Sequence, residues 1–168
     1  ALYANLEIVQ RTNHGFASDY IGLGLDATVA QGGPEFEFRN NTNYPIKVVA
    51  EYYASGGKNY LKVSLLGTKV DDTYVKIKTD VLETIPFSEQ IVETDELAPG
   101  ERKVEQTAYT GYKVKTYRNV YSGDGTLISS TFEASSNYKA RDRIVLVGKS
   151  TATTPTDPGT TPVDPGTP

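Results

Sequence analysis

Residues 97–149 decide the fold of this chain, and they read LAPGERKVEQTAYTGYKVKTYRNVYSGDGTLISSTFEASSNYKARDRIVLVGK. Glycines separate runs in which apolar or aromatic residues alternate with charged or hydroxyl residues; they are Gly100, Gly111, Gly123, Gly125 and Gly148. Alternation with a period of two, interrupted by glycine, predicts short β-strands joined by tight turns.

The same pattern continues on the N-terminal side of this stretch. A hairpin is predicted from residues 46–53 and 60–67, because their apolar positions alternate in register and residues 54–59 supply glycine and asparagine for the turn. Further strands are predicted at 27–30, 36–40, 74–79, 88–95, 102–108, 111–121, 127–135 and 143–147.

The first ten residues, ALYANLEIVQ, are predicted to be the end of a short amphipathic helix, since Leu2, Leu6 and Ile8 lie among helix-forming neighbours. The predicted fold class is therefore mainly β, with an α+β N-terminal unit. The chain opens inside a pattern and without methionine, which suggests a piece of a longer protein.

Three parts are predicted: a first unit at 1–70, an elongated all-β unit at 71–149, and a linker or tail at 150–168. The last part reads TATTPTDPGTTPVDPGTP from Thr151 onward. It is rich in threonine, proline and glycine and has no apolar periodicity. Such a segment cannot bury a core, so we expect it to be disordered and extended.

Composition excludes several classes of function. The 17 basic and 21 acidic residues are interleaved along the chain, so no nucleic-acid partner is predicted. No apolar run approaches the roughly 20 residues that span a bilayer, so no membrane span is predicted in this chain. The chain has no cysteine and one histidine, which excludes disulfides and cysteine-based or multi-histidine zinc sites. No metal site and no cofactor are predicted.

His14 and Asp26 are the candidate catalytic residues, because a histidine that acts as a general base needs an orienting partner. An alternative is that His14 caps the preceding helix, and that Asp26 accepts bonds from nearby backbone N–H groups. Without a cysteine nucleophile, this chain is not expected to be catalytic by itself.

Tyrosine supplies 12 of the 17 aromatic residues. A tyrosine ring can stack on the apolar face of a sugar while its hydroxyl forms a hydrogen bond. Among Tyr109, Tyr112, Tyr117, Tyr121 and Tyr138, the first three are the predicted glycan-binding residues. The alternative for all five is cross-strand packing in a thin sheet.

Residues 5–48 resemble the C-terminal half of the VanW-like family, whose name comes from an accessory gene of vancomycin-resistance clusters. The matching positions are Leu6, Glu7, Val9, Arg11, His14, Gly24, Asp26, Ala27, Thr28, Val29, Gly32, Gly33, Phe38, Asn40, Thr42, Pro45 and Ile46. Family members usually carry a glycine-rich segment with one cysteine just upstream, and this chain lacks that segment. The resemblance covers residues 1–67.

Residues 71–149 resemble the G-five domain, an elongated all-β module of secreted bacterial proteins. Its matching positions are Leu97, Ala98, Pro99, Gly100, Lys103, Val104, Gly111, Tyr117 and the run 143–148. The sequence departs from the family at Ala108, where many members have glycine. Family members have been proposed to bind N-acetylglucosamine.

Together the resemblances imply an extracellular module at the cell wall or cell surface of a Gram-positive bacterium. Its expected partner is peptidoglycan or another aminosugar polymer. Two alternatives remain at this point. The chain is part of a cell-wall-modifying enzyme whose cysteine lies upstream, or it is a structural spacer that presents another domain.

Overall fold

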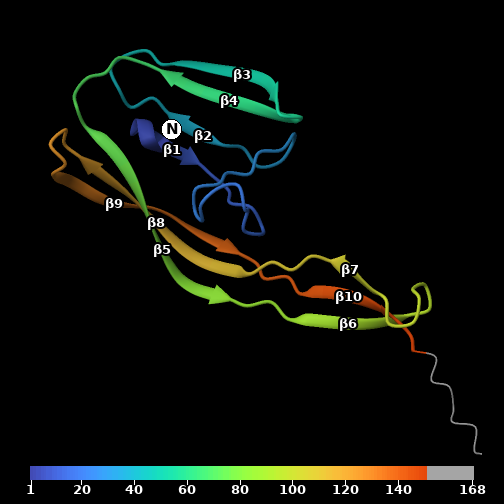
Figure 1. The fold of residues 1–168 in the computed structure, drawn as a ribbon. Coiled ribbons are helices and arrows are strands. Elements are labelled where there is room, and N and C mark those ends of the chain that lie inside the picture. Colours follow the sequence, from blue (N-terminus) through green and yellow to red (C-terminus); the bar gives the residue numbers. More distant parts are fainter. Residues whose placement is uncertain (151–168) are drawn as a thin grey trace, which may run out of the picture.

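The computed structural model describes residues 1–150, and the predicted linker beyond Ser150 lies outside the described residues. Two three-stranded sheets follow one another end to end in an elongated molecule (Figure 1). The first sheet has the order β5 (Tyr74–Ile85), β8 (Gly111–Tyr121), β9 (Leu127–Tyr138). The second has the order β6 (Glu89–Thr94), β10 (Arg143–Gly148), β7 (Arg102–Gln106).

Each chain connection between the two sheets is short. Pro86 lies between β5 and β6, where its missing N–H does not interrupt a ladder. In the second sheet, β10 pairs with β6 in parallel and with β7 in antiparallel register. β10 ends at Gly148, where a Cβ atom would lie 1.9 Å from the Ala98 carbonyl oxygen, so only glycine fits against that turn.

Alternation gives the β5–β8–β9 sheet two different faces. The face that we call the inner face carries the buried residues Val75, Val114, Thr116, Ser136 and Tyr138. Residues 1–39, which we call the N-terminal segment, cover it through contacts that include those of Leu6 and Gly24. The opposite face, the outer face, is open to solvent along all three strands. The apolar core is small, because Leu6, Val75, Val114, Tyr138 and Val145 are its only buried apolar members within residues 1–150.

The N-terminal segment is β-rich, and the predicted helix at residues 1–10 is wrong. A 3-10 turn covers Leu2–Ala4, Asn5 ends it in the left-handed conformation (φ 54°), and strand β1 (Glu7–Gln10) follows. Leu6 is buried and Ile8 is half-buried, whereas Glu7 and Val9 are exposed, so burial alternates with a period of two. Over so few residues, the same apolar positions also fit one face of a helix. β1 pairs with β2 (Glu37–Arg39).

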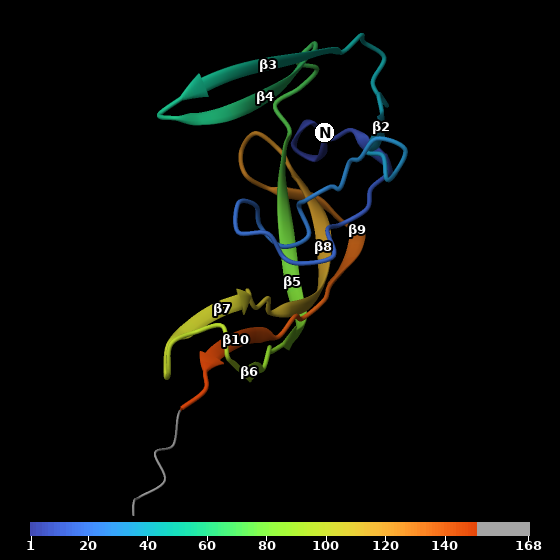
Figure 2. The same ribbon diagram turned by 90° about the vertical axis from the view of Figure 1, so that its right-hand side faces the viewer.

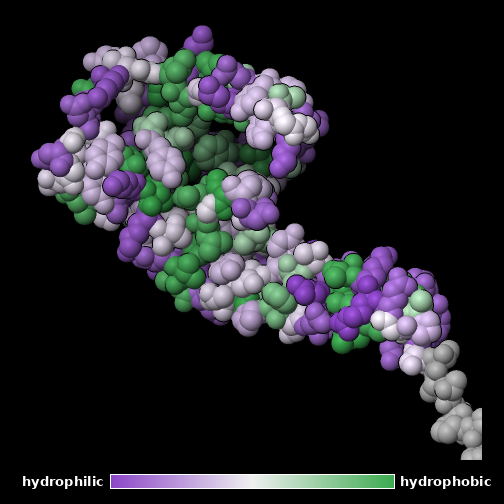
Figure 3. Space-filling view, viewed as in Figure 1, coloured by the Kyte–Doolittle hydropathy of each residue, from purple (hydrophilic) through white to green (hydrophobic). Residues whose placement is uncertain are grey.

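The predicted hairpin is confirmed as β3 (Lys47–Ser55) and β4 (Lys58–Leu66), joined through Gly56 and Gly57, both with positive φ. It projects from the body of the molecule (Figure 2). Figure 3 shows a hollow beneath it, in which apolar side chains gather.

The strand predicted at residues 27–30 is absent. These residues instead form a loop in which Thr28 N–H donates to the Thr12 carbonyl oxygen and Ala30 N–H to that of Pro34. Within residues 1–150, no helix has the length and apolarity needed to cross a membrane.

Candidate functional site

A buried carboxylate, Asp26, lies at the centre of the contact between the N-terminal segment and the β5–β8–β9 sheet. Its side chain accepts hydrogen bonds from the His14 backbone N–H (2.6 Å), His14 Nδ1 (2.8 Å), Arg11 Nη2 (3.2 Å) and the Tyr138 hydroxyl. The Tyr138 oxygen in turn accepts from the Gly24 N–H at 2.7 Å. Asp26 is 4% exposed and Tyr138 is 1% exposed, so water does not replace these bonds.

The ionised state of Asp26 follows from its partners. Burial acts to raise the pKa of its carboxyl group, but the hydrogen bonds from Tyr138 and His14 and the charge of Arg11 outweigh burial and hold that pKa below its ordinary value. Burial and the bond to Asp26 raise the pKa of the Tyr138 hydroxyl. A carboxylate can only accept, so His14 Nδ1 carries a hydrogen and its Nε2 is the nitrogen left for other partners.

The His14–Asp26 pairing predicted from the sequence is therefore present, and the helix that His14 was to cap is not. Sequence reasoning missed Tyr138 and Arg11 as the other members of the cluster. Arg11 lies only three residues before His14, but Tyr138 is more than a hundred residues away in sequence. No local pattern signals that contact.

Further bonds join the same two parts of the chain. Arg118 Nη1 of β8 donates to the Leu6 carbonyl oxygen at 2.8 Å, and the Lys139 N–H donates to the Gly15 carbonyl oxygen at 2.8 Å. Gly24 lies so close to the inner face that a Cβ atom would be 2.5 Å from a side-chain methyl carbon of Thr116. The N-terminal segment thus docks through fitted contacts along β8 and β9.

A groove of about 790 Å³ opens beside this cluster. One wall is the loop 14–20 of the N-terminal segment, and the other is the connection 107–110 between β7 and β8 together with Tyr112 at the start of β8. Its aromatic and polar lining includes His14, Phe16, Tyr20, Tyr109, Tyr112 and Thr110. The groove exists only because both parts of the chain contribute a wall.

The structure separates the predicted glycan-binding tyrosines. Tyr109 and Tyr112 line the groove, and the Tyr109 ring stacks on Phe16 with centroids 4.9 Å apart. Tyr117 lies elsewhere, on the outer face of the sheet, where it meets Phe132 edge-on at 6.0 Å. Tyr138 is buried against Asp26 and offers no surface to a glycan.

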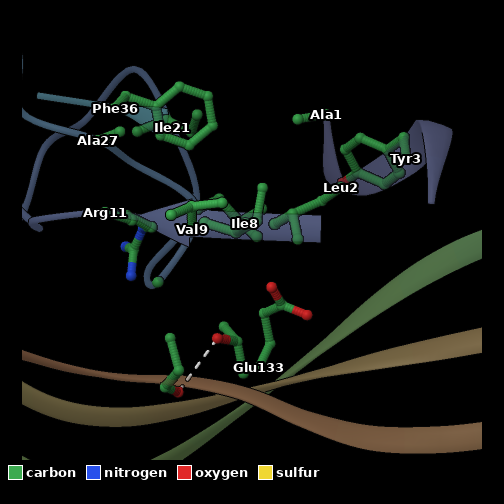
Figure 4. Close-up of a pocket in the computed structure, with 14 residues that line it drawn as sticks. Ala1, Leu2, Tyr3, Ile8, Val9, Arg11, Ile21, Ala27, Phe36 and Glu133 are labelled. Carbon is green, nitrogen blue, oxygen red and sulfur yellow. Dashed lines mark hydrogen bonds between the residues drawn. The ribbon is translucent and has the colours of Figure 1, made fainter. Parts of the chain in front are cut away.

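On the other side of β1, an apolar cavity of about 570 Å³ lies between the N-terminal segment and the sheet. Figure 4 shows Ile21, Ala27 and Phe36 on one side of Ile8 and Val9, and Glu133 on the other. Its charged lining residues already have partners: Arg11 is bonded to Asp26, and Glu133 forms a bidentate pair with Arg118. The cavity therefore offers apolar contacts.

Metal ligands do not gather at any of these places. Across residues 1–150, no group of three or more histidine, aspartate or glutamate side chains is arranged to hold a metal ion. The contact between the N-terminal segment and the β5–β8–β9 sheet, which we call the junction, offers a histidine oriented by a carboxylate, beside an aromatic groove.

Comparison with known proteins divides the chain in two. Residues 1–65 match the family described as VanW like protein, and residues 76–150 match the G5 domain. The predicted ranges, 1–67 and 71–149, differ from these by a few residues at their ends. The VanW-like match occupies the N-terminal part of this chain.

One curated relative is "Uncharacterized protein YoaR" of Bacillus subtilis (strain 168), which is 48% identical over 50 residues. Those residues are 30% of this chain and 16% of that protein, so the match spans only a small part of the relative's length.

Two solved structures are similar to part of the chain. The IgA1 protease G5 domain structure is 24% identical with a TM-score of 0.30, covering 48% of this chain and 96% of that one. The crystal structure of HP0197-G5 is 23% identical with a TM-score of 0.24, covering 44% of this chain and 95% of that one. The chain is similar to VanW-like proteins over residues 1–65 and to G5 domains over residues 76–150.

Proposed function

We propose that this chain is a non-catalytic, cell-wall-associated module of a secreted bacterial protein, and that it binds peptidoglycan or another glycan containing N-acetylglucosamine. The division into units at 1–70 and 71–149 and the extracellular location belong to the same proposal. The observation that supports it most is the groove at the junction, in which Tyr109 and Tyr112 of the G5 domain face the loop that carries His14 and Tyr20.

The lining of the groove suits a sugar chain. Aromatic rings pack against the apolar faces of pyranose rings, and tyrosine hydroxyls and the His14 ring supply polar contacts. Tyr109 is held by Phe16 and by the Arg141 guanidinium, 4.6 Å from its ring centre, so it forms a rigid wall. Tyr112 and Tyr20 are the rings left to contact a ligand. An open groove predicts weak single-site affinity that multivalent display on the wall would strengthen.

Binding to purified peptidoglycan and to a neutral chitin hexasaccharide tests the proposal. Replacing Tyr112 or Tyr20 with alanine should weaken binding at least about fivefold, the effect of losing one ring–sugar contact. Tyr52→Ala, on the exposed hairpin, is the matched control and should leave binding unchanged. Equal binding by Tyr112→Ala, Tyr20→Ala and the control would refute this groove as the site.

The His14–Asp26 pair favours a second candidate function. His14 Nδ1 lies 2.8 Å from the buried carboxylate, the arrangement of an oriented general base, and His14 lines the groove. In this alternative the chain is part of a cell-wall-modifying enzyme whose nucleophilic cysteine is supplied from outside residues 1–168. Release of soluble fragments from labelled peptidoglycan by a longer gene product, abolished by His14→Gln, would support it. Unchanged release by that variant would exclude His14 as the base.

A further inference from the structure

We propose that the outer face of the β5–β8–β9 sheet is a second binding surface, and that it binds a linear polysaccharide carrying carboxylate groups. The surface is separate from the groove at the junction, because residues directly opposite one another on neighbouring strands share one face of the sheet. Its members on β8 are the odd-numbered residues from Lys113 to Tyr121, and the N-terminal segment covers the even-numbered ones.

Aromatic rings stand at two places on this surface. At one end, Tyr74 and Tyr121 stack with centroids 5.4 Å apart and nearly parallel planes. Further along, Tyr117 meets Phe132, which is 56% exposed. Tyr117 and Tyr121 are four residues apart on one strand, which is about 13 Å. A sugar ligand that contacts both groups must therefore be a chain of several rings.

Lysines lie between and over these rings. The Lys76 ammonium group is 5.6 Å from the Tyr74 ring centre and 5.3 Å from that of Tyr121, and the Lys78 ammonium group is 5.7 Å from that of Tyr117. These cation–π contacts hold the lysine side chains along the sheet surface while their charges stay accessible to solvent.

The charge of the outer face differs in sign from that of the chain. Its strands carry four lysines, at 76, 78, 113 and 115, and two acids, Asp80 and Glu83. The chain as a whole has a net charge of −4. Asp80 pairs with Lys78 at 3.0 Å and Glu83 with Lys113 at 2.7 Å. Lys76 and Lys115 form no ion pair among residues 1–150, and Asp80, which lies opposite Lys115 across the β5–β8 ladder, is paired with Lys78 instead. Lys76 and Lys115 are therefore the charges that a ligand can reach.

This pattern favours an acidic polysaccharide over other polyanions. Two unpaired lysines match a polymer with occasional carboxylates, whereas a nucleic acid presents a phosphate at every nucleotide and is usually bound by a denser basic surface. A polyol phosphate has no rings to pack against Tyr117 and Phe132. Asp71, Asp72 and Asp124 border the surface beyond Tyr121, so the ligand extends from the tyrosine pair toward Lys115.

Titration calorimetry of the whole chain with a hyaluronate decasaccharide tests the proposal. The double variant Lys76→Gln/Lys115→Gln should weaken binding about five- to tenfold, and Phe132→Ala about fivefold. Lys47→Gln/Lys58→Gln, which removes the same charge from the exposed hairpin, should change binding less than twofold. Tyr112→Ala, in the groove, should leave hyaluronate binding unchanged, which separates this surface from the proposed glycan groove.

Neutral chitin hexasaccharide, poly(glycerol phosphate) and single-stranded oligo-dT serve as competing ligands, and each should bind the outer face at least fivefold more weakly than hyaluronate. Absence of hyaluronate binding, or equal losses in the outer-face and hairpin double variants, would overturn the proposal. Equal or tighter binding of oligo-dT or poly(glycerol phosphate) would also overturn it, because the face would then be a site for polyanions in general.

Discussion

Replacing Asp26 with asparagine tests whether the buried cluster holds the two parts of the chain together. Every group that surrounds the Asp26 side chain is a donor: the His14 backbone N–H, His14 Nδ1, Arg11 Nη2 and the Tyr138 hydroxyl. Asparagine keeps the shape but places an amide N–H₂ group against some of these donors. It also leaves the Arg11 side chain, 9% exposed, without its counter-charge.

The expected loss of stability is large. Removing one partner of a buried ion pair typically costs about 3 to 5 kcal/mol, because the remaining charge stays buried without compensation. A domain of this size has roughly 5 to 15 kcal/mol of net stability, so the N-terminal segment should detach from the inner face under mild conditions. Asp80→Asn, at the exposed pair with Lys78, is the control and should cost less than about 1 kcal/mol.

Urea unfolding followed by tyrosine fluorescence, together with amide hydrogen exchange, measures both effects. The amides of Gly24 and Thr116, which lie at the contact, should lose protection in Asp26→Asn but not in Asp80→Asn. A loss below about 1 kcal/mol, with protection retained at the contact, would refute the reasoning that this carboxylate holds the interface.

Other consequences of the same contacts can be measured separately. Gly24→Ala should cost about 2 to 4 kcal/mol because its φ is +79° and its Cβ would meet Thr116, whereas Gly32→Ala (φ +68°, open space) should show only the smaller backbone cost in the same unfolding assay. Because the native pKa of Asp26 is lowered, its ionised carboxylate stabilises the fold at pH values above its ordinary pKa of about 3.9. This stability is lost as pH falls through the lower native pKa. A pH series of unfolding free energies should show the loss in the wild type and not in Asp26→Asn. Because the native pKa of Tyr138 is raised, its protonated hydroxyl stabilises the fold below pH about 10, and this stability is lost as pH rises through the higher native pKa. Tyr138→Phe should abolish this loss of unfolding free energy at alkaline pH.

Local pattern was sufficient to predict most of the strands. β8 begins and ends at the predicted residues, because glycine and the Ser122–Gly125 turn bound a clear alternation. The β3–β4 hairpin follows from the same reasoning. The pattern failed at residues 1–10, where apolar residues at two, six and eight fit both a helix and a strand, and pairing with β2 decided the outcome.

The candidate site was predicted only in part. His14 and Asp26 are twelve residues apart, and the requirement of a histidine for an orienting partner was enough to pair them. Tyr138 and the groove between loop 14–20 and residues 107–112 depend on contacts between distant parts of the chain, which a single sequence does not report. Tyrosine spacing likewise could not show that Tyr117 lies on a different surface from Tyr112.

The position of β10 has a mechanical consequence. β10 is the last strand of the described chain, and it lies between β6 and β7 at the end of the molecule away from the N-terminal segment (Figure 1). Tension on residues beyond Gly148 pulls β10 along its own axis and loads both flanking ladders in shear. Hydrogen bonds loaded in this way resist together, whereas a terminal strand peeled from an edge would lose them one at a time. The fold therefore suits a chain that transmits force through its C-terminal end.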